Sequence, residues 1–269
     1  MIDVDAVTAI IREAAEQEIL PRFLHLKTED VRTKAHGADF VTDADLGSER
    51  VLTERLSALL PGSLVVGEEA VYQDRAVLAR LSEDAPVWVL DPLDGTGNFT
   101  QGSACFGVIV ALVQGGRTRA GWLHDPLGQT TVVAEEGGGA WSGSTRLTAS
   151  SKPQRHEMRV QTGPRLPEEF RTLLGAASWP KCAAHMYLSL VLDRAEVVVF
   201  RRLQPWDHAA GVLIHAEAGG VSGQILGGGP YVPIMSENGL LMTPDRETWE
   251  LLAPFLERDF AAHVCGKAG

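Results

Sequence analysis

Residues 86–99 read Pro-Val-Trp-Val-Leu-Asp-Pro-Leu-Asp-Gly-Thr-Gly-Asn-Phe, and the rest of the chain is interpreted around them. The apolar first part predicts a buried strand. Asp91 and Asp94 follow at its end, and the intervening proline keeps the first aspartate out of helical geometry. Gly95 permits close approach of a ligand to the backbone. This pattern suits a hard cation held by the two carboxylates, with an anion on the N–H groups near Thr96.

The pattern D-P-x-D-G is also typical of turns, and an exposed Asp-rich turn needs no function. Two further acidic segments favour a site. Glu68 follows the apolar run 63–66, so a second predicted strand also ends in a carboxylate. Asp207 opens an apolar stretch that predicts a helix to about Ala218, and a helix dipole favours a negative charge in the first turn. Each acid alone fits an ordinary surface, but together with the aspartate pair they indicate a site.

Composition limits the class of function. The 269 residues carry 24 Lys and Arg against 35 Asp and Glu, a formal charge of −11. This acidity, without a basic stripe interleaved with aromatics, argues against nucleic-acid binding. An acidic protein that binds phosphate needs local positive charge, which bound cations supply. No P-loop pattern is present, which favours hydrolysis of a monoester over nucleotide-driven work.

Cysteine usage and the N-terminus bear on the compartment. The three cysteines, Cys105, Cys182 and Cys265, form no C-x-x-C pattern. This spacing argues for a reducing compartment and against a disulfide framework or structural zinc. The first residues lack a secretion signal, and no apolar run is long enough to span a bilayer. We therefore expect a cytoplasmic protein without membrane association.

These motifs, in this order, resemble the inositol monophosphatase family, part of the metal-dependent, lithium-sensitive sugar phosphatases. The family pattern G-E-E, then D-P-[IL]-D-G-T-x-N-F, then W-D-x-A-[AG]-G matches residues 67–69, 91–99 and 206–211. A fourth matching element is 39–45, flanked by Lys34 and Glu49. The resemblance implies the family's layered α-β-α-β-α sandwich, of the inositol monophosphatase and fructose-1,6-bisphosphatase type.

The resemblance also implies a role for each matching residue. The metal ligands are four carboxylates and one backbone carbonyl, those of Glu68, Asp91, Asp94, Asp207 and Leu93. The residues that position and deprotonate the attacking water are Asp45, Glu68 and Thr96. The matching substrate-binding residues are Gly95, Thr96 and Asp207. The implied cofactor is Mg²⁺, as two or three ions, and the implied assembly is a homodimer.

The chain is long enough for one large core or two subdomains. A polar segment near residue 150 is a plausible boundary. We expect residues 1–150 to form an α+β subdomain that carries most metal ligands. Residues 151–269 are expected to form an α/β subdomain that supplies Asp207 and the substrate pocket. Helices are predicted over 4–23 and 46–60.

The substrate pocket departs from the family pattern. Enzymes that act on inositol phosphate carry a glutamate seven residues before the W-D aspartate, where this chain has Phe200. Lys181 and Cys182 replace the family's small Gly-Thr pair. Arg201 is a candidate contact for a second anionic group, as is Arg202. Because surface arginine is common, a solvated loop or pairing with surface acids is the more usual explanation for these two arginines.

The expected function is Mg²⁺-dependent hydrolysis of a small sugar, polyol or inositol phosphate by metal-activated water. Histidinol phosphate, fructose-1,6-bisphosphate and adenosine 3′,5′-bisphosphate are alternative substrates within the same superfamily. A metal-binding regulatory homologue that works through a partner is a further alternative.

Overall fold

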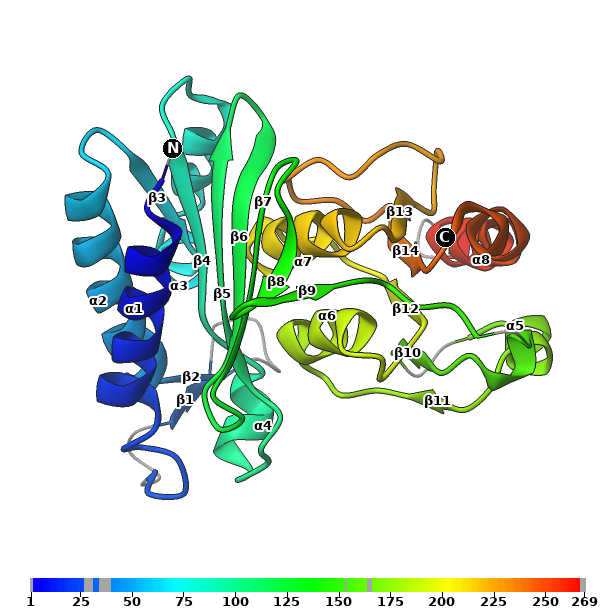
Figure 1. The fold of residues 1–269 in the computed structure, drawn as a ribbon, viewed down its shortest axis with the longest axis horizontal. Coiled ribbons are helices and arrows are strands. Elements are labelled where there is room, and N and C mark those ends of the chain that lie inside the picture. Colours follow the sequence, from blue (N-terminus) through cyan, green and yellow to red (C-terminus); the bar gives the residue numbers. More distant parts are fainter. Residues whose placement is uncertain (1, 27–30, 34–39, 153, 164–165, 267–269) are drawn as a thin grey trace.

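The computed structural model describes residues 2–26, 31–33, 40–152, 154–163 and 166–266. It shows five layers, helices and sheets in alternation (Figure 1). From one side to the other these are α1 and α2, a seven-stranded sheet, α6 and α7, a five-stranded sheet, and finally α5 with α8. The predicted α-β-α-β-α sandwich is confirmed.

The seven-stranded sheet has the order β3-β4-β5-β6-β7-β8-β9. All neighbours are antiparallel except β3 and β4. Its strands are Leu64–Gly67, Val87–Asp94, Gly107–Gln114, Arg117–Asp125, Thr130–Glu135, Gly139–Ser142 and Thr145–Leu147. Helices cover both faces, so successive residues of β4 are buried on opposite sides. This two-sided burial explains why the strand is apolar throughout.

The outer face of this sheet is covered by α1 (Val4–Ala14) and α2 (Asp43–Leu59). Apolar side chains recur along α1 at helical spacing and pack on Trp88 and Trp122 of the sheet. A π-helical turn, Ala15–Ile19, extends α1. The helix predicted over 4–23 therefore ends earlier than expected. The second helix starts earlier than predicted, because a capping box begins it at Thr42.

The five-stranded sheet has the order β11-β10-β12-β14-β13. In chain order its strands are Val160–Thr162 (β10), Ala177–Ser178 (β11), Val197–Phe200 (β12), Val221–Gln224 (β13) and Leu240–Thr243 (β14). Strand β12 is parallel to β10 and antiparallel to β14. The outer face of this five-stranded sheet packs on α5 (Glu168–Leu173) and α8 (Arg246–Gly266).

Helices α6 (Ala183–Val191) and α7 (Pro205–Glu217) form the middle layer. One apolar core joins them to both sheets, since Val89 of the first sheet and Val198 of the second belong to it. The two sheets fall on either side of residue 150, whereas this core is shared. The division into subdomains at residue 150 stays a prediction.

Short elements lie around the layers. The short strands are β1 (Val31–Thr33) and β2 (Phe40–Thr42), and the short helices are α3 (Glu68–Gln73), α4 (Thr96–Thr100) and two 3₁₀ segments, Arg75–Ser82 and Arg155–Glu157. Strands β1 and β2 pair antiparallel. Among the described helices, none has the length and apolar character needed to cross a bilayer.

Candidate metal and phosphate site

The two aspartates of strand β4 share one face because the strand carries a bulge. Asp91 pairs with Ile109 of β5, but Asp94 pairs with Gly107, so three steps on one strand oppose two on the other. In a regular strand, residues three apart point to opposite faces. The bulge corrects this alternation, and Pro92, which lacks an N–H for the ladder, lies within it. The motif therefore aims both carboxylates at the same side.

A tight turn follows the bulge. Gly95 precedes α4 with φ of +85°, a left-handed conformation that favours glycine. A Cβ added there would lie 2.9 Å from the carbonyl oxygen of Cys105. Asn98 holds the surrounding loops, because its Nδ2 donates to the carbonyls of Cys105 and Pro180, both at 2.8 Å. These contacts explain the glycine and asparagine of the motif by geometry.

Asp45 reaches the same place from the start of α2. As the third residue of the capping box, it accepts from the backbone N–H of Thr42 at 2.7 Å and from the Thr42 hydroxyl at 2.6 Å, both through Oδ2. Its Oδ1 lies 2.9 Å from Thr96 Oγ1, which is also 3.0 Å from the carbonyl oxygen of Leu93. Asp45 therefore caps a helix with one oxygen and faces a threonine hydroxyl with the other.

Glu68 begins α3 where strand β3 ends, and Glu49 of α2 supports this junction. The Glu49 carboxylate accepts from the backbone N–H groups of Glu69 at 2.8 Å and Ala70 at 2.9 Å. A Cβ added to Gly67 would lie 2.4 Å from that carboxylate. A side chain in place of the glycine of G-E-E would therefore displace the Glu49 carboxylate, which holds the helix that carries Glu68.

Asp207 lies in the first turn of α7, as predicted, behind Pro205 at the helix start, a position where proline is favoured. The next residue, His208, is fully enclosed. Its Nε2 donates to the carbonyl of Arg202 at 3.0 Å, so Nδ1 accepts from the Tyr187 hydroxyl at 2.9 Å. Burial lowers the pKa of His208 to about 4, so the ring stays neutral and serves packing.

Most residues of the predicted site line one cavity of about 270 Å³. The lining residues from the predicted site are Glu68, Asp91, Leu93, Asp94, Gly95, Thr96 and Asp207. The structure thus brings together segments from β4, α3, α4 and α7. Asp45 lies behind this lining, 1% exposed, and reaches it through Thr96.

The cavity concentrates negative charge. Burial raises the pKa of Asp94 to about 6; hydrogen bonds from Cys182 and Ala184 oppose the rise, and the charge of Glu68 adds to it. Burial likewise raises the pKa of Asp45 to about 6, with Thr42 opposing and Glu68 adding. A bound cation stabilises the ionised form of carboxylates whose pKa is raised in this way. The donor set consists of carboxylate and carbonyl oxygens, which fits a hard divalent cation such as Mg²⁺.

Some predicted residues lie elsewhere. Arg201 donates to Asp259 of α8 at 2.6 Å, and its guanidinium lies 4.5 Å from the centre of the Phe260 ring, so the structure does not bring it into the cavity lining. Phe200 stacks on Tyr187 with ring centres 5.1 Å apart. Lys34 and Asp39 of the fourth motif lie outside the described residues.

Sequence reasoning missed part of the lining. Tyr72 and Gln204 line the cavity and belong to none of the motifs. Phe40 also lines it, and although it lies within the element 39–45, the sequence assigned it no role. Lys181 takes the place of a small residue in the family pattern, and it is the single cation among the described lining residues. Its Nζ lies 5.1 Å from the centre of the Trp179 ring.

The chain is similar in sequence and in fold to known proteins. Residues 3–258 match the model of the inositol monophosphatase family. A Thermotoga maritima protein named fructose-1,6-bisphosphatase/inositol-1-monophosphatase is 28% identical over 207 residues, which cover 72% of this chain and 75% of the relative. The Escherichia coli protein named Nus factor SuhB is 31% identical over 206 residues, covering 72% and 75%. The solved Thermotoga maritima IMPase has the same fold, with a TM-score of 0.81 at 23% identity over 99% of both chains.

Proposed function

The chain belongs to the inositol monophosphatase family and is a phosphoric monoester hydrolase, and from this premise we propose that it uses Mg²⁺ to hydrolyse a small sugar, polyol or inositol phosphate. The observation that carries the proposal is the single cavity shared by four carboxylates and the Thr96 turn. Glu68, Asp91, Asp94, Asp207 and the Leu93 carbonyl would hold two or three ions. When bound, Mg²⁺ supplies positive charge for the phosphate and lowers the pKa of the attacking water.

The chain's own residues position the reactants. Thr96 Oγ1 and Asp45 Oδ1, 2.9 Å apart, form a short path for a proton. The threonine hydroxyl can accept a proton from water while it passes its own proton to Asp45. Glu68 would be the second carboxylate that contacts this water. The backbone N–H groups of Gly95 and Thr96 would hold a phosphate oxygen at the start of α4. Burial keeps Asp45 a stronger base than an exposed aspartate.

The proposal predicts phosphate release that depends on Mg²⁺. We would measure release from inositol 1-phosphate, fructose-1,6-bisphosphate, histidinol phosphate and adenosine 3′,5′-bisphosphate, with Mg²⁺ and with a chelator. Turnover of at least one compound that disappears with the chelator and returns with added Mg²⁺ is the expected result. Equal turnover under both conditions would contradict the metal-dependent mechanism.

Lys181 favours a substrate with a second anionic group. The side chain is a cation in a lining that otherwise carries acids and neutral groups. Phe200, at the position of the family's inositol-binding glutamate, stacks on Tyr187 and cannot accept a hydroxyl hydrogen bond. A bisphosphate therefore suits this pocket better than an inositol monophosphate. The Thermotoga relative is named fructose-1,6-bisphosphatase/inositol-1-monophosphatase, so both kinds of substrate belong in the test.

Lys181→Met should raise the KM for fructose-1,6-bisphosphate at least about 10-fold and leave that for inositol 1-phosphate nearly unchanged, because a charge-assisted hydrogen bond contributes ~1.5–3 kcal/mol. Steady-state kinetics on both substrates measure the difference. Arg202→Met is the matched control, since that arginine is 72% exposed and outside the lining. An equal effect of Lys181→Met on both substrates would show that the lysine does not select between them.

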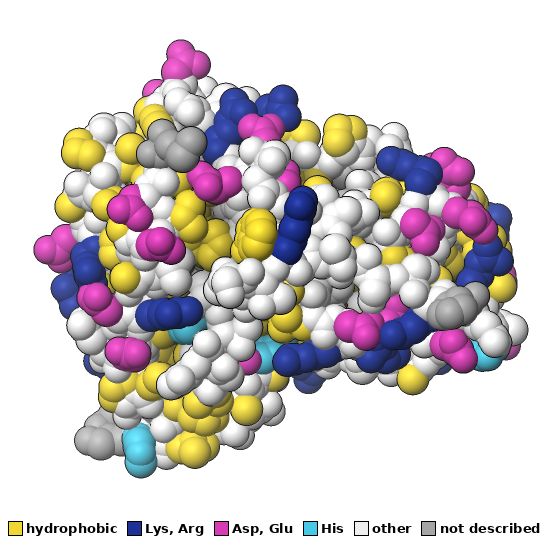
Figure 2. Space-filling model, in the orientation of Figure 1, with side chains coloured by type: hydrophobic (Ala, Val, Ile, Leu, Met, Phe, Trp, Pro, Cys, Tyr) yellow, Lys and Arg dark blue, Asp and Glu magenta, His cyan; other side chains and the backbone are white. Residues whose placement is uncertain are grey.

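A regulatory role is a second candidate, because a relative at 31% identity is named Nus factor SuhB. Retained Mg²⁺ binding without turnover of any compound in the panel would favour it. On the face seen in Figure 2, the described basic side chains are interspersed with acidic ones and form no continuous band. The homodimer and the cytoplasmic location stay predictions, and sedimentation of the purified protein tests the first.

A further inference from the structure

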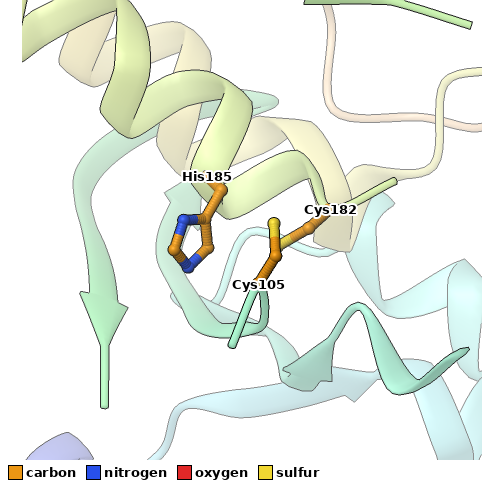
Figure 3. Close-up of side chains that lie close together, drawn as sticks. All are labelled: Cys105, Cys182 and His185. Atoms are coloured by element: carbon orange, nitrogen blue, oxygen red, sulfur yellow. The ribbon is translucent and has the colours of Figure 1, made fainter. Parts of the chain in front are cut away.

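Two cysteines and a histidine meet beside the carboxylate cavity (Figure 3). Cys105 precedes strand β5, Cys182 precedes α6, and His185 lies in the first turn of that helix. One potential ligand atom from each lies within 4.8 Å of the others. Sulfur and imidazole ligands prefer Zn²⁺ and similar soft cations, whereas the neighbouring cavity offers oxygen ligands. The two sets of donors therefore select different metals.

We propose that Cys105, Cys182 and His185 form a second metal site, which binds a thiophilic divalent cation such as Zn²⁺ and thereby inhibits hydrolysis. On binding, both thiols release their protons to solvent and no electron is transferred. The inhibitory part rests on the proposed function, whereas the binding part does not.

The surrounding structure holds the two sulfurs in place before any ion arrives. Asn98 Nδ2 donates to the backbone carbonyl of Cys105 and to that of Pro180, each at 2.8 Å, so one side chain ties the two cysteine-bearing segments together. Cys105 and His185 are only partly buried, which gives an ion access from solvent. His185 Nε2 donates to the Phe106 carbonyl at 3.0 Å, and the ring exchanges this partner for the ion when it becomes the third ligand.

The site is coupled to the carboxylate cavity through the contact between the Cys182 thiol and Asp94. Cys182 Sγ donates to Asp94 Oδ2 at 3.0 Å, and the backbone N–H of Ala184 donates to the same oxygen at 2.6 Å. A metal ion on the sulfur removes the thiol hydrogen, so Asp94 loses one of these two donors. Since Asp94 is a proposed Mg²⁺ ligand, its carboxylate is displaced from the geometry that Mg²⁺ requires.

Cadmium is a suitable probe, because a thiolate bound to Cd²⁺ gives a charge-transfer absorption in the ultraviolet that oxygen ligands do not give. We would titrate Cd²⁺ into the Mg²⁺-saturated enzyme and follow this absorption and phosphate release together. The expected result is one equivalent of thiolate-bound Cd²⁺ and a parallel loss of activity.

Cys105→Ala should abolish the absorption and raise the half-inhibitory Cd²⁺ concentration at least about 10-fold, with unchanged activity in the absence of Cd²⁺. Cys105→Ser repeats the test with a side chain of similar size. Cys265→Ala, which removes a thiol from α8, is the matched control and should behave as the wild type. If wild type and Cys105→Ala show the same absorption, the site does not exist. If the absorption differs while inhibition does not, Cd²⁺ acts at the carboxylates and the coupling is wrong.

Discussion

Asp94→Asn is expected to lower phosphate release by more than about 100-fold, because loss of a group that merely supports a metal ligand already reduces affinity or activity 10–100-fold. The asparagine oxygen can still accept from the N–H of Ala184, so the start of α6 should stay in place. The free energy of unfolding should stay equal or rise slightly, since the neutral amide removes repulsion with Glu68. Phosphate release against Mg²⁺ concentration and urea unfolding measure the two effects.

Asp125→Asn provides the control for this substitution. Asp125 ends strand β6 outside the cavity lining and accepts from the N–H of Gly128 at 2.8 Å, a bond that asparagine can keep. Its activity should be close to that of the wild type. Near wild-type activity of Asp94→Asn at saturating Mg²⁺ would show that Asp94 is not a metal ligand.

Thr96→Ala is expected to lower kcat by about 100-fold and to change KM little, since a residue that transfers a proton acts mainly in the transition state. The hydroxyl links the cavity to Asp45 Oδ1 at 2.9 Å, and alanine removes that link while leaving the N–H groups of the turn. Steady-state kinetics at saturating Mg²⁺ separate the two parameters.

Two matched substitutions make the Thr96 experiment specific. Thr96→Ser keeps the hydroxyl and should recover most of the activity. Thr100→Ala removes another hydroxyl of α4, which donates to the carbonyl of Gly97 at 3.0 Å, and should leave kcat unchanged. A rise in KM alone would make Thr96 a phosphate-binding residue without a part in proton transfer.

The acidic positions of the site could be predicted because each follows a predicted strand or opens a predicted helix in the sequence. That these side chains meet in one cavity could not be predicted in this way. Asp91 and Asp94 share a face only because the ladder with β5 slips at the bulge, and this register belongs to the pairing of two strands. Likewise, the sequence does not show that Asp45 also caps a helix. The structure shows it, because one carboxylate oxygen contacts Thr42 and the other contacts Thr96.

Long-range contacts explain the remaining differences. Arg201 directly follows Phe200, at the family's inositol-binding position, which makes it a candidate contact for a second anionic group, but Asp259 and Phe260 approach it from α8. The scattered positions of Cys105 and Cys182 argued against a metal site, whereas the fold sets them beside His185. Only the C-x-x-H spacing at the start of α6 could have given a local signal for that group.

The shared middle layer has a consequence for biosynthesis. The first sheet is complete at Leu147, but α7, which packs against it, begins at Pro205. At ~5–20 residues per second, a ribosome needs several seconds to supply that helix. Until then the nascent chain presents an apolar sheet face, which includes Val89, Ile109 and Leu123, to the crowded cell. Slow decoding between these elements would prolong that exposure, so aggregation during translation is the hazard that this architecture carries.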